Sequence, residues 1–187
     1  TYVYNLPTVR ERAQSVRGLR VDRAFYAIKA NDNPAVLRAL DEQGIGFKCV
    51  SLGELDRVFE VISGITPDKV LFTPNFAPRR DYERAIELGV NLTLDNLYPL
   101  EKWPELFKGL EVIVRVDPGQ GRGHHKKVKT AGAQSKFGVP SAEIDRLYTL
   151  AEKADVTIVG LHSHVGSGIR SAGTWSETAV FLSEIAR

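Results

Sequence analysis

Short runs of β-branched and aromatic residues alternate along the chain with longer amphipathic segments. The short runs have the length and composition of buried strands, and they span residues 24–30, 46–51, 69–73, 91–95, 111–116 and 157–165. The segments between them carry apolar residues three and four positions apart, which predicts helices, over residues 34–44, 53–64, 77–89, 98–109 and 141–154. Strands and helices in alternation form parallel βαβ units. The pattern therefore predicts an α/β protein, either a doubly wound sheet or a (β/α)8 barrel that six units cannot close.

Three segments lie outside this alternation. Residues 8–18 predict one further helix ahead of the first strand, and residues 117–141 form a long irregular connection of a kind that is usually functional or mobile. The last residues, 178–187, are apolar and periodic with no Gly or Pro to stop a helix, and the first residue is not Met. We expect a single domain over residues 1–187, truncated at about six βα units.

Composition narrows the class of partner. The 187 residues are 43% hydrophobic, which is enough for one core, and 26% charged with a formal net charge of +2. Lys and Arg are interleaved with Asp and Glu, which argues against a nucleic-acid partner and favours a small polar or anionic ligand. Cys49 is the single cysteine, so neither a disulfide framework nor a cysteine metal site is expected. No apolar run approaches the roughly 20 residues of a membrane span. We expect a cytoplasmic protein without a membrane span.

Lys29 stands near the end of the first predicted strand. Period-two alternation would place Phe25, Ala27 and Lys29 on one face, so that Lys29 ends an apolar row. Because an ammonium is costly to bury, such a site favours the neutral amine that a Schiff-base nucleophile needs. The alternative is a structural lysine that reaches the mouth of a barrel or pairs with a carboxylate.

The last predicted strand ends in a histidine-rich and glycine-rich segment. Alternation would place His162 and His164 on one face, where they could bind a metal, transfer protons or stack on a planar ring. A pair of hydrogen-bonded core histidines is the alternative. The sequence Gly-Ser-Gly at residues 166–168 could expose backbone N–H groups to an anion such as phosphate, although an ordinary turn has the same residues.

Arg115 and two groups of loop residues are further candidates with structural alternatives. Arg115 lies inside an apolar strand, where a guanidinium is tolerated only when it is paired or bound to a ligand. The glycines at 119, 121 and 123 fit neither the dinucleotide-binding nor the phosphate-loop spacing, so we interpret them as flexibility. His124 and His125 lack acidic or cysteine partners nearby. No metal site is predicted.

Together these motifs resemble one family, the alanine-racemase-like, barrel-type decarboxylases that depend on pyridoxal phosphate. Residues 26–31 (YAIKAN) resemble the signature that carries the cofactor lysine, and residues 49–55 (CVSLGEL) resemble the strand and helix that follow it. Further matches to the diaminopimelate decarboxylases occur in the same order, at residues 95–96, 115–119, 135–138 and 162–167. Residues 121–138 resemble a bacterial subgroup in which this decarboxylase can be fused to an aspartate kinase.

The resemblance implies a fold, a reaction and a set of roles. The fold would be the TIM-type (β/α)8 barrel, and the reaction would be decarboxylation of meso-2,6-diaminopimelate to L-lysine, in a homodimer. Lys29 would bind pyridoxal 5'-phosphate as a Schiff base, His164 would stack on its ring, Ser167 would help to hold the phosphate, and Arg115 would lie near the ring's polar edge. Catalysis would fall to Lys29 and His164.

The sequence also departs from the family. Lys48 stands where many members have an acidic residue, and a lysine would repel a charged amine that a carboxylate would favour. The family's last two barrel strands and its β domain have no counterpart in these residues, so we expect the chain by itself to be inactive. The alternatives are an ornithine or arginine decarboxylase of the same fold, a non-catalytic barrel that carries the same cofactor, and a plain α/β binder of sugar phosphates or nucleotides.

Overall fold

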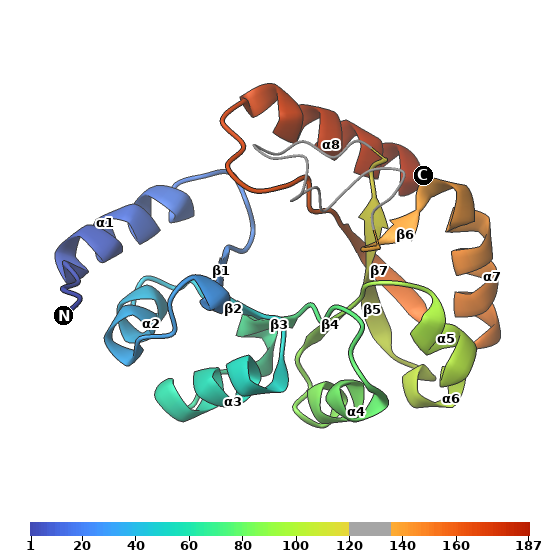
Figure 1. Cartoon of the computed structure of the whole chain (residues 1–187), viewed down its shortest axis with the longest axis horizontal. Coiled ribbons are helices and arrows are strands. Elements are labelled where there is room, and N and C mark those ends of the chain that lie inside the picture. Colours follow the sequence, from blue (N-terminus) through green and yellow to red (C-terminus); the bar gives the residue numbers. More distant parts are fainter. Residues whose placement is uncertain (120–135) are drawn as a thin grey trace. The chain divides into compact units, whose positions relative to one another are not determined.

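The computed structural model describes residues 1–119 and 136–187. The chain divides into two compact units, residues 1–92 and residues 93–187. Both units consist of parallel strands that alternate with helices, as Figure 1 shows. The predicted alternation of strand and helix is therefore confirmed. His124 and His125, and the glycines at 121 and 123, lie outside the described residues.

The first unit contains a row of short parallel strands with a helix after each of the first three. Its strands are β1 (Phe25–Ala27), β2 (Gly46–Cys49), β3 (Val70–Phe72) and the first two residues of β4 (Asn91–Leu94). Its helices are α1 (Leu6–Arg17), α2 (Pro34–Asp41), α3 (Leu52–Val61) and α4 (Arg79–Glu87), with 3-10 turns η1 (Ile28–Ala30) and η2 (Pro67–Lys69). Each strand pairs with the next one along the chain.

Local chemistry accounts for these boundaries. Helices α1 and α2 begin with an asparagine cap followed by proline, and the side chain of Asn33 accepts a hydrogen bond from the Ala35 N–H at 2.9 Å. Strand β2 begins at Gly46, where a larger residue would not fit. A Cβ atom at Gly46 would lie 2.6 Å from the Lys69 carbonyl oxygen and 2.7 Å from the Phe25 ring. The first two strands can therefore approach each other closely.

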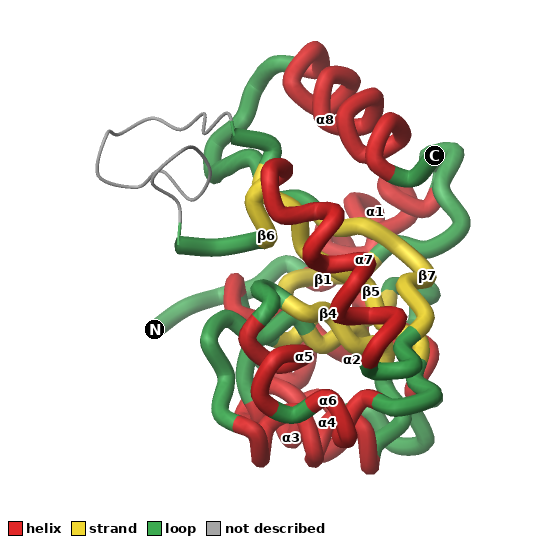
Figure 2. The backbone as a smooth tube through the Cα atoms, turned by 90° about the vertical axis from the view of Figure 1, so that its right-hand side faces the viewer, coloured by secondary structure: helices red, strands yellow, loops and turns green. Residues whose placement is uncertain are grey.

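In its described residues, 93–119 and 136–187, the second unit contains the end of β4, strands β5 (Glu111–Asp117), β6 (Val139–Pro140) and β7 (Thr157–His162), and four helices. The helices are α5 (Tyr98–Lys102), α6 (Pro104–Phe107), α7 (Ile144–Lys153) and α8 (Ala172–Ile185), with the 3-10 turn η4 (Ser141–Glu143) ahead of α7. Strand β5 pairs in parallel with β4, β6 and β7. Figure 2 shows α7 beside β7, against which it packs.

Two details of the second unit differ from the sequence prediction. The short strand β6 lies within the predicted loop 117–141, and it pairs with Val116 and Asp117 at the end of β5. A strand of two residues is too short to show a period. The helix predicted over residues 98–109 is broken between α5 and α6 because Pro104 has no N–H and disfavours helical backbone at the residue before it. Trp103 accordingly has φ −137° and ψ 47°.

Candidate functional site

Lys29 lies in the turn that follows β1. The strand ends at Ala27, and Ile28–Ala30 form the 3-10 turn η1, closed by the Asn31 N–H donating to the Ile28 carbonyl at 3.0 Å. In this turn Ile28 is fully buried, whereas Lys29 is exposed. The prediction that Lys29 continues the row of Phe25 and Ala27 is therefore wrong, because the strand stops before the alternation reaches it. The amine is accessible to a ligand from solvent.

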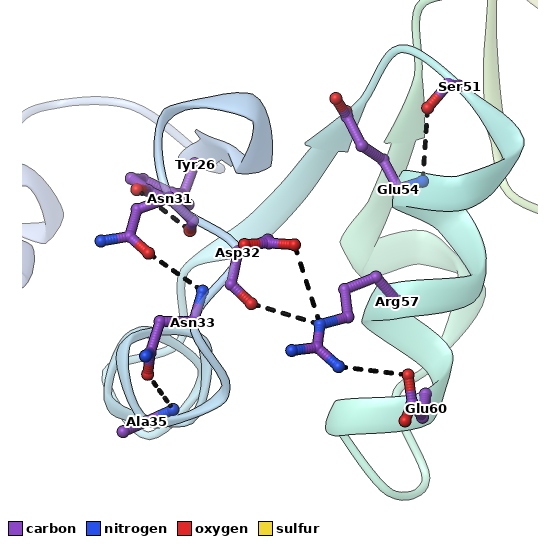
Figure 3. A network of polar contacts seen from close by, with 9 residues as sticks. All are labelled: Tyr26, Asn31, Asp32, Asn33, Ala35, Ser51, Glu54, Arg57 and Glu60. Atoms are coloured by element: carbon purple, nitrogen blue, oxygen red, sulfur yellow. Dashed lines mark hydrogen bonds and ion pairs between the residues drawn. The ribbon is translucent and has the colours of Figure 1, made fainter.

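The residues directly after Lys29 are fixed by neutral hydrogen bonds (Figure 3). The Tyr26 hydroxyl donates to the Asn31 carbonyl at 3.4 Å, and the Asn31 side chain accepts from the Asn33 N–H at 3.0 Å. Asn33 in turn caps helix α2. The turn carrying Lys29 is thus connected without a break to the start of a helix, which limits how far its backbone can move.

Helix α3 supplies a second attachment for this segment. The Arg57 Nε atom donates to the Asp32 carbonyl at 3.3 Å, and its Nη1 atom pairs with Glu60 Oε2 at 3.2 Å (Figure 3). The start of α3 is itself well defined, because Ser51 Oγ accepts the Glu54 N–H at 3.3 Å. The motif at residues 49–55 therefore builds the helix start from which Arg57 reaches Asp32.

Arg115 occupies β5 in the second unit and forms a buried ion pair. Its Nη1 atom donates to Asp95 Oδ1 at 2.8 Å, and the two residues are only 8% and 1% exposed. The sequence allows a paired or a ligand-bound guanidinium, and the paired arrangement is present. Asp95 follows β4, so the two strand ends are joined by this pair.

Burial and ion pairing shift the pKa of Asp95 in opposite directions. Burial raises the pKa of Asp95, while Arg115, the Asn96 side chain and the Gly138 N–H each lower it, and the net pKa is raised. The stabilisation from these partners therefore offsets only part of the cost of burying the carboxylate. The second oxygen, Oδ2, is buried and accepts no hydrogen bond from the part of the chain that the structure describes.

Residues 136–138 complete the surroundings of Arg115. The guanidinium carbon lies 5.1 Å from the centre of the Phe137 ring, a cation–π distance. Gly138 has φ +82°, and a Cβ atom there would lie 2.9 Å from the Asp117 backbone nitrogen. Only glycine allows this segment to approach β5 so closely. Sequence analysis missed Asp95 and Phe137 as partners of Arg115, although both lie in motifs that it had identified.

The histidines lie at and beyond the end of β7. The Cα atom of His162 pairs in register with that of Arg115, so the two residues are neighbours across β5 and β7. Strand β7 ends at His162, and the predicted alternation therefore does not extend to His164, which is half-buried ahead of the buried Val165. Ser167 is exposed.

The glycine-rich segment is a turn rather than a helix start. Gly166 and Gly168 have φ values of +132° and +69°, which other residues rarely adopt, and α8 begins only at Ala172. Anion binding by the first turn of α8 is therefore not supported for Ser167. Of the predicted site residues, the second unit holds Arg115, His164 and Ser167, and the first unit holds Lys29.

The described residues contain neither a cluster of metal ligands nor a membrane span. Within residues 1–119 and 136–187, no three His, Cys, Asp or Glu side chains gather as metal ligands would. No helix of the described residues is both long and apolar enough to cross a lipid bilayer.

Comparison with known proteins gives consistent matches. The family described as "Pyridoxal-dependent decarboxylase, pyridoxal binding domain" matches residues 7–183, across the boundary between the two units. The diaminopimelate decarboxylase of Methanothermobacter thermautotrophicus is 38% identical over 148 residues, which cover 79% of this chain and 34% of the relative. The family description names the predicted cofactor, pyridoxal, and thereby confirms it.

Solved structures confirm the fold class. The diaminopimelate decarboxylase of Helicobacter pylori complexed with L-lysine has a TM-score of 0.86 at 23% identity, covering 98% of this chain and 48% of that chain. The arginine decarboxylase of Paramecium bursaria Chlorella virus has a TM-score of 0.79 at 24% identity, covering 96% and 47%. Identities this low show the fold alone. The chain spans between a third and a half of the length of these relatives.

Proposed function

Because the chain belongs to the pyridoxal-binding domain family of the pyridoxal-dependent decarboxylases, we propose that it is the cofactor-binding part of a diaminopimelate decarboxylase. The full-length protein would convert meso-2,6-diaminopimelate into L-lysine and carbon dioxide. The observation that carries this proposal is the accessible amine of Lys29, held in a fixed turn at the end of β1. The identity to a diaminopimelate decarboxylase, 38% over 148 residues, favours this substrate.

The residues present fit pyridoxal 5'-phosphate. The cofactor requires a primary amine that its aldehyde can reach, and Lys29 is exposed. It also requires donors for a phosphate, and the turn at Ser167 offers a hydroxyl and the backbone of two glycines with positive φ. A planar ring can stack on an imidazole, which His164 supplies. We propose, as the family resemblance implies, that Lys29, His164, Ser167 and Arg115 serve the cofactor.

Each of these residues would have one task. Lys29 would bind the cofactor covalently through Nζ, release it when the substrate amine arrives, and then carry a proton on the same atom. His164 would hold the ring plane, and Ser167 would bind the phosphate. Arg115 would present a fixed positive charge near the polar edge of the ring. When bound, the cofactor supplies a sink for the electron pair that loss of carbon dioxide leaves on the substrate.

The proposal also covers the domain organisation and the oligomeric state. We propose that both units form one cofactor-binding domain, because a single family match spans residues 7–183. We further propose that the full-length protein is a cytoplasmic homodimer, as the family resemblance implies, and light scattering on the purified protein would test the dimer. The 187-residue chain by itself is expected to release no carbon dioxide from any amino acid.

The closest alternative is a decarboxylase of the same fold that acts on ornithine or arginine. The fold does not distinguish diaminopimelate from these substrates, because an arginine decarboxylase is also a close structural match. Carbon dioxide release from diaminopimelate, ornithine and arginine by the full-length protein would separate these substrates. Release from ornithine or arginine alone would reject the proposed substrate while leaving the cofactor assignment intact.

The first experiment is an absorbance spectrum of the full-length protein with pyridoxal 5'-phosphate, recorded with and without Lys29→Ala. A near-ultraviolet to visible band is expected in the wild-type protein, and borohydride reduction should fix the cofactor on the peptide that contains Lys29. A matched control is Lys69→Ala, since Lys69 lies in the same unit and pairs with Asp41 at 3.4 Å. The control should keep the band. A band that survives loss of Lys29 would leave a simple anion binder as the better interpretation.

A further inference from the structure

The ion pair of Asp95 and Arg115 is buried, and burial of two charges costs free energy. Replacement of a buried ion pair by apolar residues of similar volume is often neutral or stabilising, so such a pair is weak evidence for a purely structural role. Here the carboxylate is 1% exposed, and its pKa is raised by burial despite the arginine beside it. The pair also lies where strands β4 and β5 end, which is where parallel α/β folds place their working groups.

Asp95 and Phe137 both lie against the guanidinium of Arg115. Asp95 Oδ1 accepts from Nη1 at 2.8 Å, and the Phe137 ring lies 5.1 Å from the guanidinium carbon. The backbone of Arg115 is also in register with His162 on β7. The Asn96 side chain and the Gly138 backbone also lower the pKa of Asp95. The ion pair thus links the ends of β4 and β5, and the Phe137 contact adds the segment before β6.

We propose that Asp95 is a positioning residue for the cofactor site, which acts by holding the Arg115 guanidinium in one orientation. The role rests on the proposed function, since it requires Arg115 to serve the cofactor. Asp95 itself does not touch the cofactor in this proposal. Its buried second oxygen, Oδ2, has no hydrogen-bond partner within the described residues. A carboxylate that served only stability would be expected to have both oxygens hydrogen-bonded.

The test uses the full-length protein and measures its affinity for pyridoxal 5'-phosphate and the position of the Lys29-dependent absorbance band. Asp95→Asn and Arg115→Gln should each weaken cofactor binding about tenfold or more, because hydrogen bonds to charged groups are lost. The double variant should bind no more than about twofold more weakly than either single variant, since both changes remove the same interaction. The band should shift alike in all three variants.

Two further variants separate positioning from folding. The apolar pair Asp95→Leu with Arg115→Met should unfold at a temperature equal to or above that of the wild type, yet bind the cofactor as weakly as Arg115→Gln. Glu101→Gln is the matched control, because Glu101 also pairs with an arginine of the second unit, at 2.7 Å, but that arginine is exposed. The control should leave affinity and spectrum unchanged.

Each of these measurements either supports or overturns the positioning role of Asp95. Cofactor affinity within about twofold of wild type in Asp95→Asn or in the apolar pair would overturn the positioning role, as would fully additive losses in the double variant. A wild-type protein without a Lys29-dependent band would instead reject the proposed function, and the role of Asp95 with it.

Discussion

The two cations that sequence analysis singled out, Lys29 and Arg115, are held in opposite ways. Lys29 is exposed in a turn whose neighbours are fixed mainly by backbone and amide hydrogen bonds, with Arg57 donating to the Asp32 carbonyl, whereas Arg115 is buried and paired with a carboxylate. A guanidinium cannot be deprotonated in a protein, so it can be buried only with a partner. An amine that must react covalently has to stay within reach of its ligand. The chemistry of each group thus accounts for its surroundings.

The largest effect in this comparison is expected from Arg115→Ala. Removal of one partner leaves Asp95 buried without its counter-charge, which should lower the free energy of unfolding by about 3–5 kcal/mol. Urea denaturation of the full-length protein measures the change. The exposed Arg146, which pairs with Glu101 in the same unit, is the control, and Arg146→Ala should cost about 0–1 kcal/mol. Equal losses would show that burial does not distinguish the pairs.

Cys49 is a buried nucleophile, in contrast to the exposed Lys29. Burial, then the nearby Glu54, raises the pKa of Cys49 to about 12, with a smaller opposing effect of Lys48. Since the unfolded thiol loses its proton near pH 9, the free energy of unfolding should fall by about 1.4 kcal/mol per pH unit as pH rises between these values. Cys49→Ala should lack this component. Rapid alkylation of Cys49 in the native protein at pH 8 would contradict the assignment.

Gly138→Ala tests how closely the chain packs beside Arg115. A Cβ atom would lie 2.9 Å from the Asp117 nitrogen, and the residue has φ +82°, so the expected cost is about 1–3 kcal/mol. Gly109→Ala is the matched control, because Gly109 has φ +74° with no atom within 4 Å of the added Cβ. Thermal unfolding of both variants isolates the steric part. If Gly109→Ala proves the more harmful, close packing at Gly138 is not the cause.

Asn33→Ala removes one of the neutral hydrogen bonds beyond Lys29. Loss of the helix cap should cost about 1 kcal/mol, and Asn33→Ser, which retains a capping oxygen, should restore most of it. The urea midpoint of the full-length protein reports the change. An alanine variant as stable as the serine variant would show that the cap contributes nothing to this turn.

The smallest effect on stability is expected from Lys29→Ala. Substitution of an exposed residue should change the free energy of unfolding by no more than about 0.5 kcal/mol. The same variant should lose the cofactor absorbance band completely. This separation of stability from cofactor binding is the sharpest contrast with Arg115, and a strong loss of stability would mean that Lys29 has a structural task.

The sequence predicted the order of strands and helices because the helical segments repeat apolar residues three and four positions apart and the strands stand out as short β-branched and aromatic runs. It could not predict the two-residue strand β6, or that β1 ends at Ala27. Residues 28–30 look like a continued strand, and only the packing of Ile28 into the core turns Lys29 outward.

The sequence identified individual candidate residues, but it did not predict the contacts between them. Arg115 was a candidate from its charge within an apolar strand, yet its partner Asp95 stands 20 positions earlier along the chain. Period and composition describe neighbours along the sequence, whereas this pair forms only when two strand ends meet. A buried acid at one strand end beside a basic residue on the next strand is the signal that could have identified it.

The strand order of the first unit also bears on how the protein is made. Strands β2, β3 and the start of β4 each pair with the strand that precedes them, so the pairings of this unit use no residue beyond Leu92. Chains emerge from the ribosome amino terminus first. We therefore expect the turn bearing Lys29 to be shaped during translation, before the residues that surround Arg115 have all been synthesised.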